Sequence, residues 1–178
     1  MPVDMPFEDI LHTTLNLEGG ETWDTGGHTN YGITQATYDA VAPTLGLPPK
    51  NVKDLNYGEV RKVYENEYYR KPKIDRLPTD RLQGIMFDWG VNAGTGTAIK
   101  KLQEIVGTKP DGIMGKKTLK AVNEYIAQKG ENTLYFDIMG ERVNHYNNLI
   151  ASNPVKYGEY EQGWMNRINK LADKYNGF

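Results

Sequence analysis

The sequence has no cysteine among its 178 residues. Without thiols, the fold has no disulfide, and a cysteine nucleophile or a cysteine-containing zinc site is excluded. The three histidines, His12, His28 and His145, lack the spacing of metal ligands, so we expect ordinary hydrogen-bonding roles for them. The sequence therefore predicts neither a metal site nor another cofactor, and it argues against an amidase or peptidase.

A strong charge and a long apolar run are missing as well. The formal net charge is −2, whereas nucleic-acid-binding proteins normally carry a clear positive excess, so nucleic acid is not an expected partner. No apolar run approaches the roughly 20 residues that span a bilayer, so stable membrane insertion is not expected. The first 17 residues contain Asp4, Glu8 and Asp9 and no basic segment, which argues against a conventional secretory signal. The composition predicts an ordinary folded protein, and we expect a monomer.

What is present is a carboxylate placed at the end of a helix. Apolar residues at helical spacing between positions 7 and 15 predict a helix that ends at Glu18, because Gly19 and Gly20 follow it. Glu18 shares the apolar face and meets the negative end of the helix dipole, and both effects raise the pKa of its carboxyl group. A carboxylic acid that stays protonated near neutral pH is what a general acid requires.

The stretch from Glu21 to Thr34 predicts a small β-hairpin, because Gly26-Gly27 lies between two runs of strand-forming residues. Such a hairpin would bring Asp24 and Thr29 towards Glu18. Two acidic groups with a hydroxyl that orients water are the minimum for hydrolysis of a glycosidic bond. Spacing alone leaves open that Glu18 is a surface residue and Asp24 a turn former.

Capping patterns predict further helices along the chain. Thr34 is the expected N-cap of a helix over 35–41, and Asn56 with Glu59 forms a capping box for a helix that reaches Arg70. Thr79 is expected to cap a helix that is apolar on nearly all sides and therefore buried, ending between positions 90 and 94. Residues 97–122 are expected to form a helix, a tight glycine turn and a second helix. Helices are also predicted from 132 or 133 to 153 and over 161–175, the last with Arg167 paired to an acidic residue of an earlier helix. About seven helices and one hairpin indicate a mainly helical α+β fold.

Four residues are candidate sugar contacts. An aromatic ring offers a stacking platform, a carboxylate accepts hydrogen bonds, and an amide both donates and accepts them. The candidates are Tyr31, Asp88, Trp89 and Asn92. Core packing is the alternative role for Trp89.

One long motif resembles a known family. The pattern E-G-G followed by D-x-G-G-x-T-N-x-G-I-T, present over 18–20 and 24–34, is similar to the signature of glycoside hydrolase family 108, the phage and prophage N-acetylmuramidases. The resemblance implies a lysozyme-like fold with the hairpin beside an active-site cleft, and hydrolysis of the β-1,4 bond between N-acetylmuramic acid and N-acetylglucosamine, with Glu18 as the acid. The order of Glu18, Asp24 and Thr29 is also similar to the catalytic Glu, Asp and Thr of phage-type lysozymes, but the interval from Glu18 to Asp24 is shorter here.

A second resemblance covers the following segment. Residues 97–122 resemble the predicted peptidoglycan-binding domain that accompanies the family 108 segment. Together the two imply a catalytic segment over 1–94 and a peptidoglycan-binding segment over 95–178, packed into one globule. They imply a bacteriolytic, antimicrobial endolysin that is made in the host cytoplasm, released through a holin, and active on periplasmic peptidoglycan. A lytic transglycosylase that yields 1,6-anhydromuramic acid and a non-catalytic peptidoglycan-binding protein stay open as alternatives.

Overall fold

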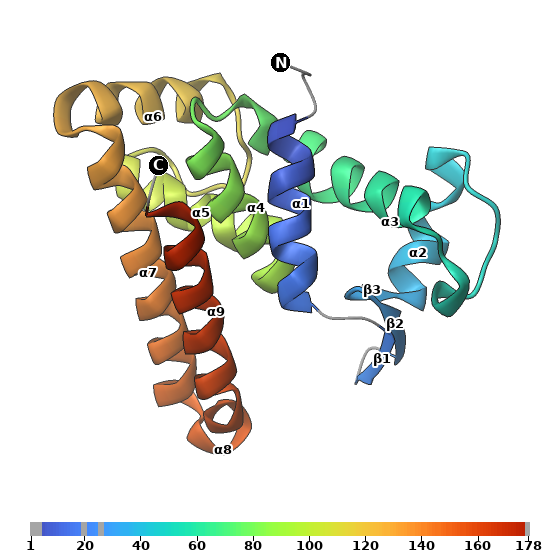
Figure 1. Cartoon of the computed structure of the whole chain (residues 1–178). Helices are drawn as coiled ribbons and strands as arrows, with labels where there is room; N and C mark the ends of the chain where they lie inside the picture. Colours follow the sequence, from blue (N-terminus) through green and yellow to red (C-terminus); the bar gives the residue numbers. More distant parts are fainter. Residues whose placement is uncertain (1–4, 19–20, 25–26, 177–178) are drawn as a thin grey trace. The chain divides into compact units, whose positions relative to one another are not determined.

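The structure is a computed structural model that describes residues 5–18, 21–24 and 27–176, with side chains over 7–18 and 31–176. The chain forms two compact units, Met1–Pro72 and Lys73–Phe178. Figure 1 shows that the first unit combines helices with a small sheet, whereas the described part of the second consists of helices and their connections.

The described part of the first unit contains three α-helices, three short strands and several 3-10 or π-helical turns. Its elements are α1 (Met5–Glu18), β1 (Glu21–Asp24), β2 (Gly27–Asn30), β3 (Ile33–Thr34), α2 (Gln35–Val41), η1 (Pro43–Leu45), η2 (Val52–Asp54), α3 (Tyr57–Tyr64) and η3 (Glu65–Arg70). The predicted caps are confirmed: the Thr34 hydroxyl accepts a hydrogen bond from the Thr37 amide at 3.1 Å, and Asn56 and Glu59 form a complete capping box. The helical segment ends at Arg70 as predicted, but its last six residues, η3, are π-helical.

The strands form an antiparallel sheet in the order β1-β2-β3. The predicted hairpin is confirmed, with Glu21 opposite Asn30 and Asp24 opposite Gly27. The third strand adds to it, since Asn30 lies opposite Ile33. Only Tyr31 and Gly32 connect β2 to β3, with φ angles of 52° and 85°. A two-residue hairpin loop with positive φ at both positions has the character of a type I′ turn, whose twist matches that of the strands.

The second unit is built from helices of very different length. Its elements are η4 (Ile74–Arg76), α4 (Asp80–Ala93), α5 (Thr95–Val106), α6 (Lys116–Lys129), α7 (Glu131–Ser152), α8 (Pro154–Tyr157), η5 (Gly158–Tyr160) and α9 (Glu161–Tyr175). Thr79 caps α4 as predicted, and every residue of α4 from 81 to 90 is buried, as its apolar surface indicated. Helix α7 starts at Glu131, just before the predicted start at Asn132 or Thr133. Among the described residues, no helix has both the length and the apolar character to cross a membrane.

Candidate active site

Glu18 is the last residue of α1, and α1 is fixed against the helical segment that follows in the same unit. The Phe7 and Tyr69 rings pack with their centroids 4.5 Å apart. Arg61 of α3 forms an ion pair with Glu8, and the hydrogen bonds from Arg61 and Tyr57 hold the pKa of Glu8 below its usual range although burial acts to raise it. These contacts fix the helix whose end carries the candidate acid.

The Glu18 carboxyl group lies against the turn between β2 and β3. A Cβ atom added at Gly32 would lie 2.7 Å from Glu18 Oε2 and 2.9 Å from the Tyr64 hydroxyl oxygen. Real Cβ atoms do not come this close to other atoms, so the carboxylate occupies the space that only a glycine leaves open. The Tyr31-Gly32 turn thus forms one wall beside a half-buried Glu18.

Two tyrosines lie near this turn and the Glu18 carboxylate. Tyr64 of α3 is fully buried, and its hydroxyl donates a hydrogen bond to the Tyr31 carbonyl oxygen. The Tyr68 ring lies beside that of Tyr64, with 5.5 Å between centroids. Burial, followed by the negative charges of Glu67 and Glu18, raises the pKa of the Tyr68 hydroxyl, so Glu18 and Tyr68 lie within electrostatic reach. Tyr68 belongs to the π-helical turn η3, a type of element that is frequent at functional sites.

This arrangement can hold a proton for transfer. The Glu18 carboxyl group is half-buried beside Gly32 and is therefore partly shielded from water, and loss of water favours the neutral, proton-bearing form of a carboxyl group. Because its burial is only partial, the same group stays partly accessible. The raised pKa of Glu18 expected from the sequence stays a prediction.

The other two candidate catalytic residues, Asp24 and Thr29, are described only by their backbones. Asp24 ends β1 and pairs with Gly27, and Thr29 in β2 lies opposite Thr22 and Thr34. Their side chains lie outside the described residues, so their catalytic roles stay predictions. Tyr31, the nearest candidate sugar contact, is 39% exposed on its turn and is therefore open to a ligand.

Asp88 lies inside the second unit, where it joins two arginines. Arg167 binds both carboxylate oxygens at 2.9 Å, and Arg142 Nη2 lies 2.9 Å from Oδ2. The predicted partner for Arg167 is thereby found. Asp88 is fully buried, so its surroundings indicate a structural role, and a direct sugar contact would require these ion pairs to separate.

Trp89 and Asn92 continue the same interior. The Trp89 ring is fully buried, with Arg142 6.0 Å from its centroid and the His145 ring at 6.3 Å, as the core-packing alternative requires. The half-buried Asn92 accepts a hydrogen bond from the Tyr146 hydroxyl, which in turn accepts one from Arg142 at 2.8 Å. Both side chains therefore belong to the network around Asp88.

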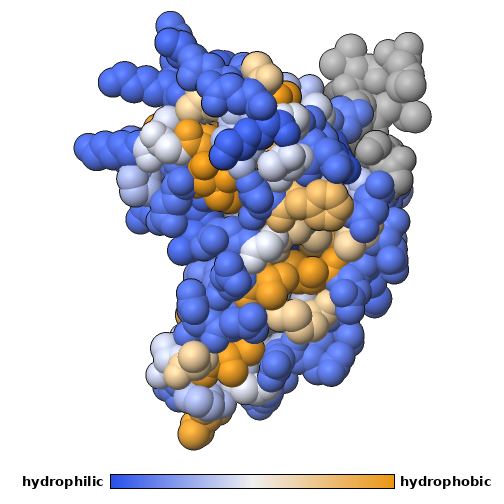
Figure 2. Space-filling model, turned by 90° about the vertical axis from the view of Figure 1, so that its left-hand side faces the viewer, coloured by the Kyte–Doolittle hydropathy of each residue, from blue (hydrophilic) through white to orange (hydrophobic). Residues whose placement is uncertain are grey.

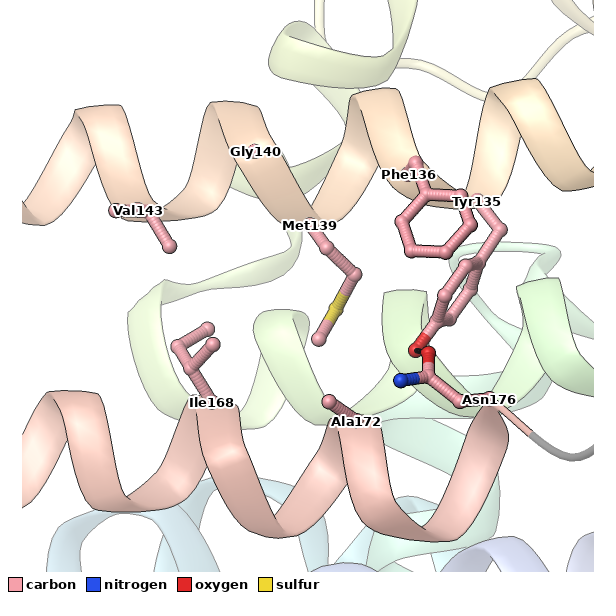
Figure 3. A pocket seen from close by; sticks show the side chains of 8 residues that line it. All are labelled: Tyr135, Phe136, Met139, Gly140, Val143, Ile168, Ala172 and Asn176. Carbon is pink, nitrogen blue, oxygen red and sulfur yellow. Dashed lines mark hydrogen bonds between the residues drawn. The ribbon is translucent and has the colours of Figure 1, made fainter.

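The second unit also carries an apolar hollow between α7 and α9. Figure 2 shows apolar areas that interrupt a mostly hydrophilic face. The hollow has a volume of about 280 Å³. Its walls, drawn in Figure 3, consist of Tyr135, Phe136, Met139, Gly140, Val143, Ile168, Ala172 and Asn176. No carboxylate lines this hollow, so it lacks the acid that glycoside hydrolysis needs.

Sequence reasoning missed three members of the site around Glu18. Gly32 is part of the motif quoted above, but nothing in the neighbouring sequence predicts that it lies beside the Glu18 carboxylate. Tyr64 was expected in the core, which is confirmed, yet its bond to the turn links positions 33 residues apart. Tyr68 was expected on the buried face of the helix that reaches Arg70, but not in a π-helical turn. Within the described parts of the chain, no three His, Cys, Asp or Glu side chains gather as metal ligands would.

Two family models match the chain. Residues 11–94 match the model for glycosyl hydrolase 108, and residues 97–169 match that for a predicted peptidoglycan domain. Residues 11–94 are therefore similar to glycosyl hydrolase family 108. The family 108 match includes α4, although α4 lies in the second compact unit. This enzyme is a glycoside hydrolase, and its partner is peptidoglycan.

A solved structure of similar fold supports the family 108 assignment. The structure of Brucella abortus SagA superposes with a TM-score of 0.72 and 27% sequence identity, over 97% of this chain and 94% of that one. No curated protein matches the sequence. The predicted mainly helical, lysozyme-like fold of the family 108 enzyme is confirmed.

Proposed function

We propose that this family 108 enzyme is an N-acetylmuramidase that hydrolyses the β-1,4 bond between N-acetylmuramic acid and N-acetylglucosamine. Glu18 donates its proton to the glycosidic oxygen while positive charge develops on the muramic acid carbon. The observation that supports this role is the half-buried carboxyl group at the end of α1, set against Gly32 and Tyr64.

Asp24, Thr29 and Tyr31 have supporting roles in this proposal. Asp24 in its ionised form stabilises the developing charge or activates water, and Thr29 orients that water. Tyr31 contacts the sugar through its exposed ring. A separation of about 6.5–9.5 Å between the Glu18 and Asp24 carboxyl groups would make the reaction inverting, and about 5–5.5 Å would make it retaining.

The test is digestion of purified peptidoglycan by the wild type and by Glu18→Gln. We expect new muramic acid reducing ends from the wild type and a rate at least about 100-fold lower for Glu18→Gln, because removal of a general acid typically costs this much. Glu124→Gln is the matched control, since it removes one negative charge from an exposed, 58% accessible carboxylate of α6 and should keep full activity. Equal activity of Glu18→Gln and Glu124→Gln would exclude Glu18 as the acid.

A lytic transglycosylase is the second candidate, because that reaction also uses a single glutamate as acid but needs no water. Mass spectrometry of the same digest separates the two reactions. A 1,6-anhydromuramic acid end identifies the transglycosylase, whereas a free reducing end identifies the muramidase. A protein that binds peptidoglycan without cleaving it would give neither product.

We further propose that the enzyme is a phage endolysin and acts as a monomer. In this proposal, it is made in the host cytoplasm, is released through a separate holin, and then degrades the cell wall in the periplasm as a bacteriolytic, antimicrobial agent. The peptidoglycan domain match over 97–169 supports action at the wall.

A further inference from the structure

The turn that walls Glu18 contains a residue in an uncommon backbone conformation. Tyr31 has a φ of 52°, in the left-handed region that side chains other than glycine adopt at a cost. Type I′ turns usually carry Asn-Gly or Asp-Gly, whereas this turn is Tyr-Gly. A strained residue of this kind persists only when its surroundings hold it, and such residues cluster at functional sites.

Tyr64 of α3 holds the Tyr31-Gly32 turn in this conformation. Its hydroxyl donates a hydrogen bond to the carbonyl oxygen of Tyr31 itself. The Tyr64 hydroxyl oxygen would lie only 2.9 Å from a Cβ built at Gly32, so the hydroxyl group bonds to Tyr31 and occupies space beside Gly32. Tyr64 is 1% exposed and packs in the interior of the first unit, so its ring, and with it the hydroxyl group, is held in one position.

We propose that Tyr64 is a positioning residue for the acid: its hydroxyl holds the Tyr31-Gly32 turn against the Glu18 carboxyl group and so fixes that group for proton transfer. The inference depends on the proposed role of Glu18 and adds the residue that acts through it.

Loss of the hydroxyl has a specific consequence for the acid. Without the bond to its carbonyl, the strained turn can move away from Glu18, and water can reach the carboxyl group. More water favours the ionised form, so the pKa of Glu18 falls and less of the acid carries a proton at neutral pH. The described titratable groups on the elements around Glu18 are Tyr31 on the turn, Tyr64 on α3, and Tyr68 with the neighbouring Glu67 on η3.

The chain offers a matched control in Tyr38. Tyr38 and Tyr64 are both fully buried tyrosines of the first unit, and each donates its hydroxyl to a backbone carbonyl, that of Pro48 at 2.6 Å in the case of Tyr38. Substitution by phenylalanine removes the same kind of hydrogen bond in each. Only the substitution at Tyr64 should alter the acid.

The experiment measures kcat and KM on purified peptidoglycan fragments across pH for wild type, Tyr64→Phe and Tyr38→Phe. For Tyr64→Phe, we expect kcat at neutral pH to fall about tenfold and the fall of kcat with rising pH to occur about one pH unit lower, since one unit of pKa changes the protonated fraction about tenfold. KM should stay within about twofold, because the acid and not sugar binding has changed. Tyr38→Phe should keep the wild-type profile.

A double variant guards against a general loss of folding. Tyr31→Asn introduces the residue that type I′ turns favour, so the turn should hold its shape without Tyr64. Because Tyr31 is also the proposed sugar contact, the double variant is compared with Tyr31→Asn alone. We expect Tyr31→Asn/Tyr64→Phe to have the same kcat and pH profile as Tyr31→Asn, with circular dichroism and thermal midpoints recorded for every variant. A folded double variant whose kcat at neutral pH is about tenfold below that of Tyr31→Asn would overturn the inference.

The outcomes separate this inference from the proposed function. If Glu18→Gln is inactive and Tyr64→Phe has the same pH profile as Tyr38→Phe, the role of Tyr64 is refuted and that of Glu18 stands. If Glu18→Gln keeps full activity, the proposed function itself fails, and the inference fails with it.

Discussion

At the scale of single residues, Gly32 is required for two separate reasons. Its φ of 85° lies in the left-handed region, and its missing side chain leaves room for Glu18 Oε2. The first requirement is one of backbone conformation and affects stability, whereas the second is one of space and affects the acid. Both the conformation of the turn and the position of the Glu18 carboxylate therefore depend on this glycine.

Gly32→Ala should therefore reduce both stability and activity. An alanine in a left-handed conformation costs about 1–2 kcal/mol, and its Cβ would displace the Glu18 carboxyl group. We expect kcat to fall at least about tenfold, since small misplacements of catalytic groups cost one to two orders of magnitude. Urea unfolding and peptidoglycan digestion measure the two effects.

Gly46→Ala is the control for this substitution. Gly46 also has a positive φ, 69°, but a Cβ there would meet no described atom within 4 Å. It should lose similar stability and keep activity. Equal activities of the two variants would contradict the contact between Gly32 and Glu18.

At the scale of elements, one buried carboxylate joins three helices of the second unit. Asp88 of α4 binds Arg142 of α7 and Arg167 of α9, and all three side chains are buried. Charges in an interior are tolerated only when they are paired, so each helix depends on the other two for compensation.

Asp88→Asn should for this reason destabilise the protein by about 3–5 kcal/mol, because it leaves two buried arginines without their counter-charge. The measurement is the free energy of urea unfolding. Glu124→Gln, which breaks an exposed ion pair at 3.7 Å, should change it by about 0–1 kcal/mol. Unchanged stability of Asp88→Asn together with a raised KM would instead support the sugar contact predicted from the sequence.

The same elements show what a sequence can predict. The caps at Thr34, Asn56 and Thr79 were predictable because each involves residues only three positions apart. The partner of Arg167 was not, because Asp88 lies 79 positions away and other acidic residues were equally possible. Glu18 could be singled out because an acid on an apolar helix face breaks a local rule. Its neighbour Tyr64 could not, because nothing local distinguishes it from other core tyrosines.

At the scale of the whole molecule, several paired carboxylates link stability to pH. A hydrogen bond from Lys50 holds the pKa of Glu59 below its usual value, and the Ile113 amide does the same for Asp111. A lowered carboxyl pKa stabilises the fold above the ordinary pKa, and this contribution disappears as the pH falls through the folded-state value. Burial, with the charges of Lys101 and Arg142, lowers the pKa of His145, so its protonation opposes folding below about pH 6.5.

We therefore expect the free energy of unfolding to fall from pH 7 towards pH 3.5, first through His145 and then through the carboxylates. Urea titrations at several pH values measure this decline. Glu59→Gln should show a smaller decline below pH 5 than the wild type, because the variant lacks the carboxylate whose ion pair with Lys50, at 2.7 Å, is lost on protonation. A decline identical to that of the wild type would show that this pair does not contribute.

The apolar hollow between α7 and α9 has a practical consequence for such measurements. Phe136, one of its lining residues, is 54% exposed, so we expect hydrophobic fluorescent dyes to bind to the native enzyme at this hollow. Melting curves recorded with these dyes should begin from a bright baseline and lose contrast. Intrinsic tryptophan emission, carried by the fully buried Trp89 among others, reports unfolding without that interference.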